Sequence, residues 1–348
     1  MAFKHGITVT EVSDGSRTLS SVSTAIIGLI ATGPDADAAT FPLNRPALVT
    51  DIDTAIGKAG TSGTLKKALQ AIADEAQPII VVVRVEEGTG ADAEAITADQ
   101  SAKVIGTNVD GSKTGMQALL AAEAQLGVRP KILGAPGLDT KEVLTAAIVV
   151  AKRLRGFVYG AAEGATVAEA IAYRKAFAAR ELMLIWPDFL SFDTDAEATV
   201  TSWGVARALG LRAQIDESTG PHKTLSNVVV DGVTGLTKDV QWDLQNADTE
   251  ANLLNASEVT ALVRTSSGFR FWGNRSCDDT GVYVFESTVR VAQLVADTVG
   301  LGMEWAMDKP LTPALVKDIV ETINGYLNSL KTQGIILGGK CWYSATGN

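Results

Sequence analysis

The chain has 348 residues, of which 46% are hydrophobic and 20% are charged, and its formal net charge is −10. This length and composition predict a globular protein of two or three domains, and the acidic balance argues against nucleic acid as its main partner. Its two cysteines, Cys277 and Cys341, suit neither a disulfide framework nor a metal cluster, and no apolar run is long enough to span a bilayer. We therefore expect synthesis in a reducing cytoplasm, no nucleic-acid partner and no membrane insertion.

The first 21 residues are predicted to form an extended arm. Apolar and polar residues alternate in a β-branched stretch, which predicts a strand made of Ile7, Thr8, Val9, Thr10, Glu11 and Val12. A polar linker follows at residues 13–18. The strand either folds back onto its own domain or pairs with the sheet edge of a neighbouring subunit.

Strands and helices alternate through the next part of the chain. Strands are predicted at residues 22–31, 47–49, 78–85, 130–133, 156–159 and 181–186, and helices at 63–76, 114–126, 139–155, 166–179 and 197–212. This alternation is typical of an α/β layer with a mixed, largely parallel sheet flanked by helices. We assign it to a middle domain over residues 22–250.

The character of the sequence changes after the last of these helices. The pattern predicts a hairpin at residues 227–237, a strand pair at 258–264 and 268–272, helices at 282–301 and 312–331, and an apolar strand at 333–337. We assign residues 251–348 to an α+β C-terminal domain.

The most distinctive stretch is aromatic and runs from Ser267 to Asp279. Alternation along a strand places Phe269 and Phe271 on one face and Arg270 and Trp272 on the other, with Arg275 just beyond. Such a stretch forms either a ligand site or a packed corner in which arginines stack on rings.

One string has a faint resemblance to a phosphate-binding loop. Residues Gly106–Thr114 precede a predicted helix, but Lys113 stands one place too late after Gly111 for its ammonium to reach the phosphates. A tight turn with Thr114 at the helix N-cap is the favoured interpretation, and a nucleotide-binding enzyme is the alternative.

Other catalytic and metal-binding patterns are weak. The chain has two histidines, His5 and His222, and it lacks the G-x-S-x-G motif of a nucleophile elbow. Four acidic residues gather after one predicted strand: Asp188, Asp193, Asp195 and Glu197. Acidic residues ahead of a helix are favoured by its dipole, so we prefer that explanation to a cation site. We expect no catalytic residue, cofactor or metal.

Several stretches together resemble the contractile tail sheath family of bacteriophages and phage-tail-like bacteriocins, above all the short sheaths of P2-like phages and R-type bacteriocins. The resemblance rests on Asp110–Leu120, Pro130–Asp139, Asn252–Asn255 and Gly268–Arg275, and its order and spacing hold along nearly the whole chain.

The resemblance implies a structural subunit of a virion tail, not an enzyme. Sheath proteins assemble as stacked six-subunit rings around a tail tube, between baseplate and terminator proteins. The sheath then contracts and drives the tube through a bacterial envelope. In the family, N- and C-terminal arms pair as strands with neighbouring subunits, which favours strand donation by residues 7–12. The aromatic stretch then becomes a packed corner, with Arg270 and Arg275 bracing it or a subunit contact.

Two expectations remain open. Family members continue beyond the position of Asn348 into a strand-forming arm, so we expect this chain to remain monomeric or to form short oligomers. A non-contractile shell or adaptor protein of a virus-like particle is a further alternative, and it would show one ring geometry where a sheath shows two.

Overall fold

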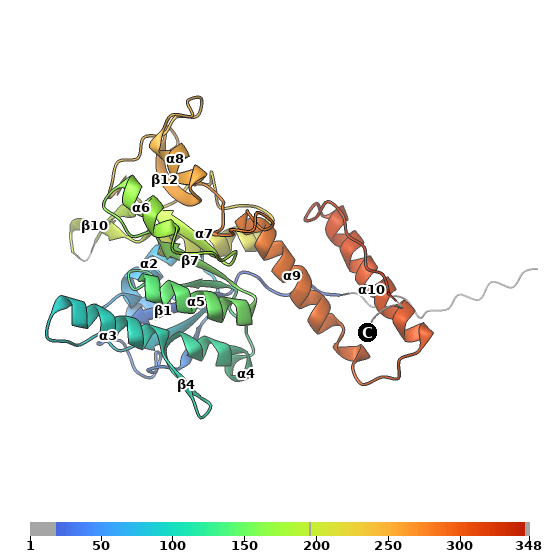
Figure 1. Ribbon diagram of the computed structural model, residues 1–348. Coiled ribbons are helices and arrows are strands. Elements are labelled where there is room, and N and C mark those ends of the chain that lie inside the picture. The colour runs from blue at the N-terminus through green and yellow to red at the C-terminus, as the bar shows by residue number, and fades with distance from the viewer. Residues whose placement is uncertain (1–18, 195, 345–348) are drawn as a thin grey trace, which may run out of the picture. The chain divides into compact units, whose positions relative to one another are not determined.

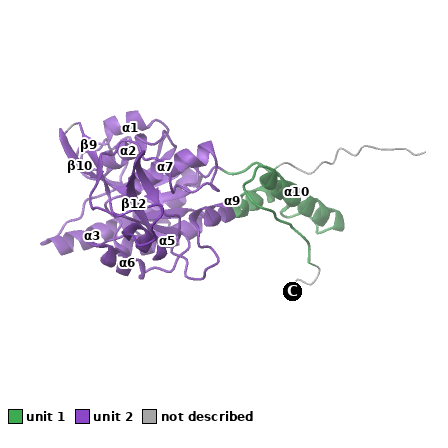
Figure 2. Cartoon of the chain, turned by 90° about the horizontal axis from the view of Figure 1, so that it is seen from above, with its two compact units in different colours: residues 1–22, 294–348 green, residues 23–293 purple. Residues whose placement is uncertain are grey.

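The structure is a computed structural model that describes residues 19–194 and 196–344 (Figure 1). The predicted strand at residues 7–12 lies outside the described residues. The chain divides into two compact units, which we call unit 1 (residues 1–22 and 294–348) and unit 2 (residues 23–293) (Figure 2). The domain limits inferred from the sequence, near residues 21 and 250, remain a prediction.

Unit 2 is built on an eight-stranded sheet with the strand order β13-β12-β8-β7-β6-β1-β3-β2. The strands are β1 (Ile27–Thr32), β2 (Pro46–Val49), β3 (Ile80–Val85), β6 (Ile132–Gly134), β7 (Phe157–Ala161), β8 (Leu182–Trp186), β12 (Val259–Thr265) and β13 (Gly268–Trp272). Only the two edge strands, β2 and β13, pair antiparallel to their neighbours. This confirms the predicted mixed, largely parallel sheet.

The central strands are mostly apolar because both faces of the sheet are covered. Ile27 and Leu29 of β1 belong to one buried core, whereas Ile26 and Ile30 belong to a second core on the opposite face. All six residues of β3 are buried as well. Burial on both sides favours apolar residues, which explains the uninterrupted run Ile80–Val83, and the buried Arg84 that follows donates to the backbone oxygens of Phe41 and Gly33.

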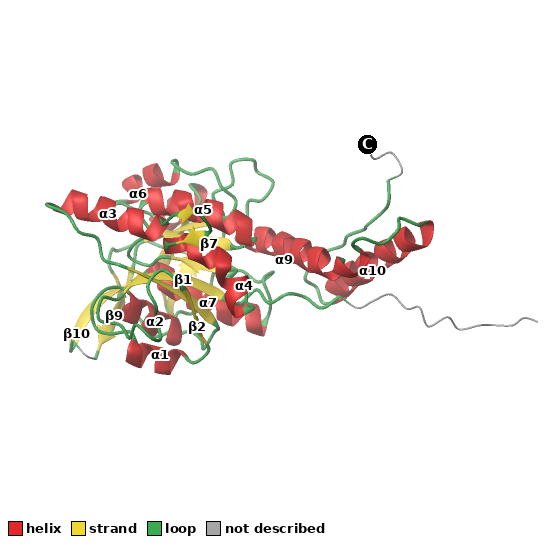
Figure 3. Cartoon of the chain, turned by 90° about the horizontal axis from the view of Figure 1, so that it is seen from below, coloured by secondary structure: helices red, strands yellow, loops and turns green. Residues whose placement is uncertain are grey.

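Helices form a layer on each face of the sheet (Figure 3). The first core includes residues of α1 (Ile52–Lys58), α2 (Leu65–Ala73) and α7 (Gly204–Ser218). The second includes residues of α3 (Ala93–Ile105), η1 (Gly115–Ala121), α4 (Ala122–Leu126), α5 (Lys141–Leu154), α6 (Val167–Arg174) and α8 (Glu250–Ala256). The sheet is therefore enclosed by helices on both faces.

Two predictions for the middle of the chain are wrong. Residues 197–202 do not begin the helix predicted at 197–212. Residues 198–202 form strand β10 (Ala198–Ser202), whose centre is β-branched and which pairs with β9 (Phe189–Asp193). Helix α7 begins only at Gly204. Residues 227–237 do not form a hairpin either, because β11 (Gly235–Leu236) pairs with β9, and Val229 forms a bridge with Arg270 of β13.

Unit 1 consists mainly of helices. Helix α9 (Glu286–Gly302) begins in unit 2 and ends in unit 1, where η2 (Glu304–Ala306) and α10 (Pro313–Thr332) follow. Thr312 caps α10 by accepting a hydrogen bond from the backbone of Leu315 at 3.2 Å. The strand predicted at 333–337 is wrong, since these residues form turns and bends after α10. No helix within the described residues has the length and hydropathy needed to cross a membrane.

Candidate functional site

The string Gly106–Thr114 folds as a small β-hairpin. Strands β4 (Asn108–Val109) and β5 (Ser112–Lys113) pair antiparallel, and Asp110 and Gly111 turn between them with φ angles of 49° and 80°. Positive φ at both positions is typical of a two-residue type I′ turn, for which Asp-Gly is a favoured sequence. A phosphate loop leads directly into the N-terminus of an α-helix. Here the element that follows the hairpin is the 3-10 helix η1.

The acidic residues after β8 are used in local structure. Asp188 accepts a hydrogen bond at 2.8 Å from the backbone N–H of Gly204, the first residue of α7, and burial raises the pKa of Asp188. Asp193 accepts one from Ala196 at 3.1 Å, Glu197 is exposed, and Asp195 lies outside the described residues. Within the described parts of the chain, no three His, Cys, Asp or Glu side chains gather to hold a metal ion.

Of the two histidines, only His222 belongs to the described residues, and it has no catalytic partner there. His5 lies outside the described residues. The Nδ1 atom of His222 is buried, and it has no hydrogen-bond partner among the described residues. Burial also raises the pKa of the Cys277 thiol to about 12, which keeps it protonated and unreactive at neutral pH.

The aromatic strand β13 packs on both sides of the sheet edge. The ring of Phe271 is fully buried and stands edge-on to Phe189, with ring centroids 5.6 Å apart, and Phe269 makes a similar contact with Phe189 at 6.5 Å. On the opposite face, Trp272 packs edge-on against Trp242 at 5.1 Å. Phe269 and Phe271 therefore share one face, as alternation predicts.

Arg270 ties β13 to the loop that covers its outer edge. Its Nη1 atom donates to the backbone and side-chain oxygens of Asn227 at 2.8 and 2.9 Å, and its Nη2 atom donates to Ser267 at 2.7 Å. Arg275 is exposed and forms a backbone bridge with Phe285. Whether this corner contacts another subunit stays a prediction.

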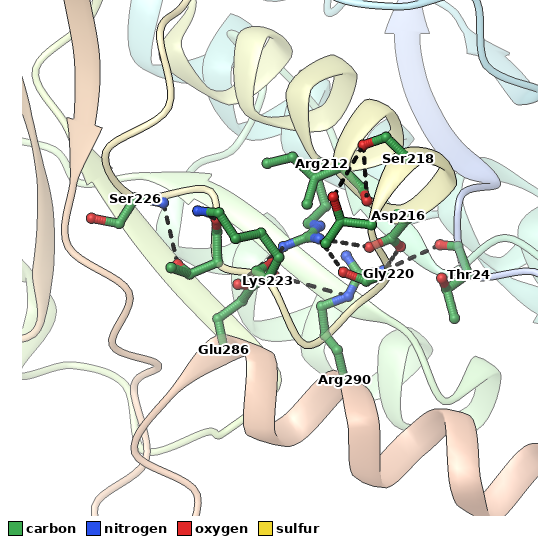
Figure 4. A network of polar contacts seen from close by, with 12 residues as sticks. Thr24, Arg212, Asp216, Ser218, Gly220, Lys223, Ser226, Glu286 and Arg290 are labelled. Atoms are coloured by element: carbon green, nitrogen blue, oxygen red, sulfur yellow. Dashed lines mark hydrogen bonds and ion pairs between the residues drawn. The ribbon is translucent and has the colours of Figure 1, made fainter. Parts of the chain in front are cut away.

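A buried ionic network lies between α7 and the first turns of α9 in unit 2, and Figure 4 shows it. Arg212 contacts Asp216 at 2.7 Å and Glu286 at 3.2 Å, and Arg290 pairs with the other oxygen of Asp216. All four side chains are at most 3% exposed. Two cations thus face two carboxylates inside the protein.

Tyr159 of β7 completes this network. Its hydroxyl donates to Glu286 at 2.6 Å and accepts from Arg290 at 3.2 Å. Burial and the Glu286 carboxylate raise the pKa of Tyr159. Burial alone would lower the pKa of Arg290, but Asp216, Tyr159 and Glu286 outweigh it and raise that pKa. Arg290 therefore stays charged.

This network was not predicted from the sequence. Its charges stand at i and i+4 on two helices, Arg212 with Asp216 and Glu286 with Arg290. Spacing of this kind is common on solvated helix faces. A signal that could have pointed to it is that Arg212 stands among apolar residues in the sequence of α7; in the structure eleven of the fifteen positions of α7 are buried.

Unit 1 carries an apolar groove beside α10, with a volume of about 620 Å³. Its apolar lining includes Leu311, Pro313, Val316, Val320, Trp342 and Tyr343. Leu311 and Trp342 are 76% and 72% exposed. Exposed apolar surface of this kind often marks a protein–protein contact.

The C-terminal segment is held along this groove by one side chain. The Asn324 amide donates to the backbone oxygen of Cys341 at 2.9 Å and accepts from the Cys341 N–H at 2.8 Å. These are the only hydrogen bonds that Gly338–Tyr343 makes within the described residues. Apart from Cys341, the backbone groups of this segment have no hydrogen-bond partner among the described residues, and the segment has no regular secondary structure.

Comparison with known families gives three successive matches. The matching models are the tail sheath protein Gp18 domain III N-terminal region at residues 24–85, the phage tail sheath protein central domain at 111–277 and the phage tail sheath C-terminal domain at 278–348.

Similar proteins are known in sequence and in structure. The tail sheath protein of Escherichia phage P2 is 53% identical over 99% of this chain and 88% of its own length. The major tail sheath protein of Serratia phage KSP20 is 47% identical over 99% and 87%. The contracted helical sheath of the anti-feeding prophage has a TM-score of 0.68 at 16% identity, covering 94% of this chain and 84% of that one. The contracted PVC sheath of an extracellular contractile injection system also has a TM-score of 0.68, at 17% identity over 98% and 85%. The structural matches show the same fold.

Proposed function

The chain belongs to the phage tail sheath protein family, and we propose that its copies polymerise as stacked six-subunit rings around a tail tube. It is a structural subunit of a contractile tail sheath, not an enzyme, and its place is the tail of a virion or phage-tail-like particle. The observation that carries this conclusion is the 53% identity to the phage P2 tail sheath protein along almost the entire chain.

The proposed cycle stores energy in contacts between subunits. Copies assemble in an extended sleeve between baseplate and terminator proteins and around the tube protein. A signal from the baseplate releases the sleeve, subunits slide and rotate, and the shortening sleeve drives the tube through a bacterial envelope. A subunit with this role requires large complementary surfaces and no nucleotide hydrolysis.

Residues 7–12 are proposed to donate a strand to a neighbouring copy. The described chain starts in unit 1, where Ser21 contacts Tyr326 of α10 at 3.2 Å and the Val22 N–H donates to Thr298 at 3.4 Å. The segment Gly338–Tyr343 lies in the same unit, and its backbone groups other than those of Cys341 are proposed to accept an added strand. Apolar side chains of the incoming strand would then cover the groove beside α10.

Disulfide trapping tests this exchange. Cys341 is half-buried in the groove and Cys277 is buried, so a cysteine introduced by Val9→Cys has Cys341 as its accessible native partner. We expect oxidation of assembled V9C protein to link two copies, and Cys341→Ser to abolish that link. Mixed copies with two different tags distinguish a link between copies from one within a chain. A link confined to single chains would show that the arm folds back, and no link at all would exclude this acceptor.

A further inference from the structure

The chain passes between its two compact units twice, at residues 22/23 and at residues 293/294. Within unit 2, both ends are held close to these crossings. The Arg290 Nη2 atom donates to the backbone oxygen of Thr24 at 3.1 Å, and the Gln293 side chain donates to the backbone oxygen of Gly156 at 2.9 Å. Both segments are therefore fixed immediately before they leave unit 2.

The buried ionic network is the common anchor of these segments. Arg290 uses one nitrogen for Asp216 and Thr24 and the other for Tyr159, so a single guanidinium joins α7, β7, α9 and the entering chain. On the other side, Arg212 donates to the backbone oxygens of Lys223 and Gly220 at 2.6 and 3.3 Å. A planar guanidinium with several fixed partners allows only one arrangement of the helices around it.

Energetics favour a positioning role over a stabilising one. Removing charges from water is costly, and replacement of a buried ion pair by apolar side chains of similar size is often neutral or even stabilising. The same replacement loses the directional contacts that fix one helix against another. The net charge of the network is zero, so an apolar pair can replace Asp216 and Arg290 without leaving a charge in excess.

We propose that Arg212, Asp216, Glu286 and Arg290 form a rigid joint, which holds the first turns of α9 and the segment at Thr24 in one arrangement within unit 2. This inference rests on the proposed function, in which the arm and unit 1 connect neighbouring copies. Force passed along those connections reaches the α/β body at the joint.

The test compares two charge-neutral double variants of the full chain. Asp216→Leu with Arg290→Met removes half of the joint and its tie to Thr24. Glu123→Leu with Arg129→Met removes the partly exposed 2.6 Å ion pair between Glu123 of α4 and Arg129, and it serves as the charge-neutral control. Hydrogen exchange is measured on the unassembled protein, and sheaths assembled with tube protein are examined by electron microscopy.

We expect the joint variant to keep the amide hydrogen-exchange protection of β1, β3 and β8. Amides at residues 23–26 and 286–293 should exchange at least about tenfold faster, because these segments can then open without breaking the buried ionic network. Its sheaths should be irregular in spacing or absent, whereas the control matches the unchanged chain. Unchanged exchange together with regular sheaths from the joint variant would overturn the proposal.

Two milder variants keep the proposal testable if the joint variant does not fold. Arg290→Lys retains the charge but cannot reach Asp216, Tyr159 and Thr24 at once, and Gln293→Leu removes only the contact with Gly156. Both should show the same local acceleration with little change in melting temperature, and normal exchange in both would refute the joint. The exchange experiment needs no assembly, so a failure of the strand-exchange test leaves it unaffected.

Discussion

Glu75 gives this protein a pH dependence that a single substitution should remove. The residue is 5% exposed at the end of α2, its carboxylate accepts from the Asp231 N–H at 3.2 Å, and Arg207 lies 3.6 Å away. Arg207 also forms an ion pair with Asp74, at 2.6 Å between Nη1 and Oδ2. Burial raises the pKa of Glu75 from 4.5 to about 8, against the opposing effects of Arg207 and the Asp231 N–H.

The sign and the size of the effect follow from proton binding. Between pH 4.5 and 8 the folded protein holds a proton on Glu75 that the unfolded chain has lost, so stability falls as pH rises. Each pH unit costs about 1.4 kcal/mol, which gives a loss on the order of 4–5 kcal/mol by pH 9 relative to pH 4. Below pH 4.5 the contribution is fully retained.

Urea unfolding at pH 5 and pH 9 measures this difference. Glu75→Gln keeps an acceptor for Asp231 and carries no charge, so its stability should change several kcal/mol less between the two pH values than that of the unchanged chain. Glu217→Gln, on an exposed position of α7, is the control and should behave like the unchanged chain. Equal pH dependence in the Glu75→Gln variant and the unchanged chain would refute the reasoning.

Three further outcomes are expected. Phe271→Ala should lower the free energy of unfolding by about 3–5 kcal/mol in chemical denaturation, and Phe269→Ala by less because its ring is only partly buried. Gly106→Ala should lower the melting temperature clearly more than Gly111→Ala, since a Cβ would overlap a backbone carbonyl at the first position and meets open space at the second; equal losses would contradict this. Val9→Pro should abolish assembly seen by electron microscopy with little change in monomer melting; a matching fall in melting temperature would show that the arm folds onto its own chain.

The sequence predicted the central sheet well because its signal is local. Strands buried on both faces favour long apolar runs, such as Ile80–Val83, and apolar residues in the predicted helices between them recur at the helical period. The helix predicted from Glu197 failed for a different reason. Residues 198–202 are β-branched at their centre, but only pairing with β9 decides that they form a strand. The C-terminal apolar run 333–337 found no strand partner among the described residues.

The candidate site was harder to predict than the fold. Alternation placed Phe269 and Phe271 on one face correctly, because period two is a property of the strand itself. The ionic network joins residues 74 positions apart, Arg212 with Glu286, and no local pattern specifies such a pairing. Asp, Glu and Arg side chains usually face solvent, so the burial of these four residues becomes evident only from the packing of α7 against α9.

Electron cryomicroscopy of particles that carry this protein, imaged before and after contraction is triggered, tests the central claim most directly. We predict six copies in each ring, two helical states that differ in length and diameter, and density for residues 7–12 that continues into a neighbouring copy. A single ring geometry in both conditions would contradict the claim and would identify a static shell or adaptor protein instead.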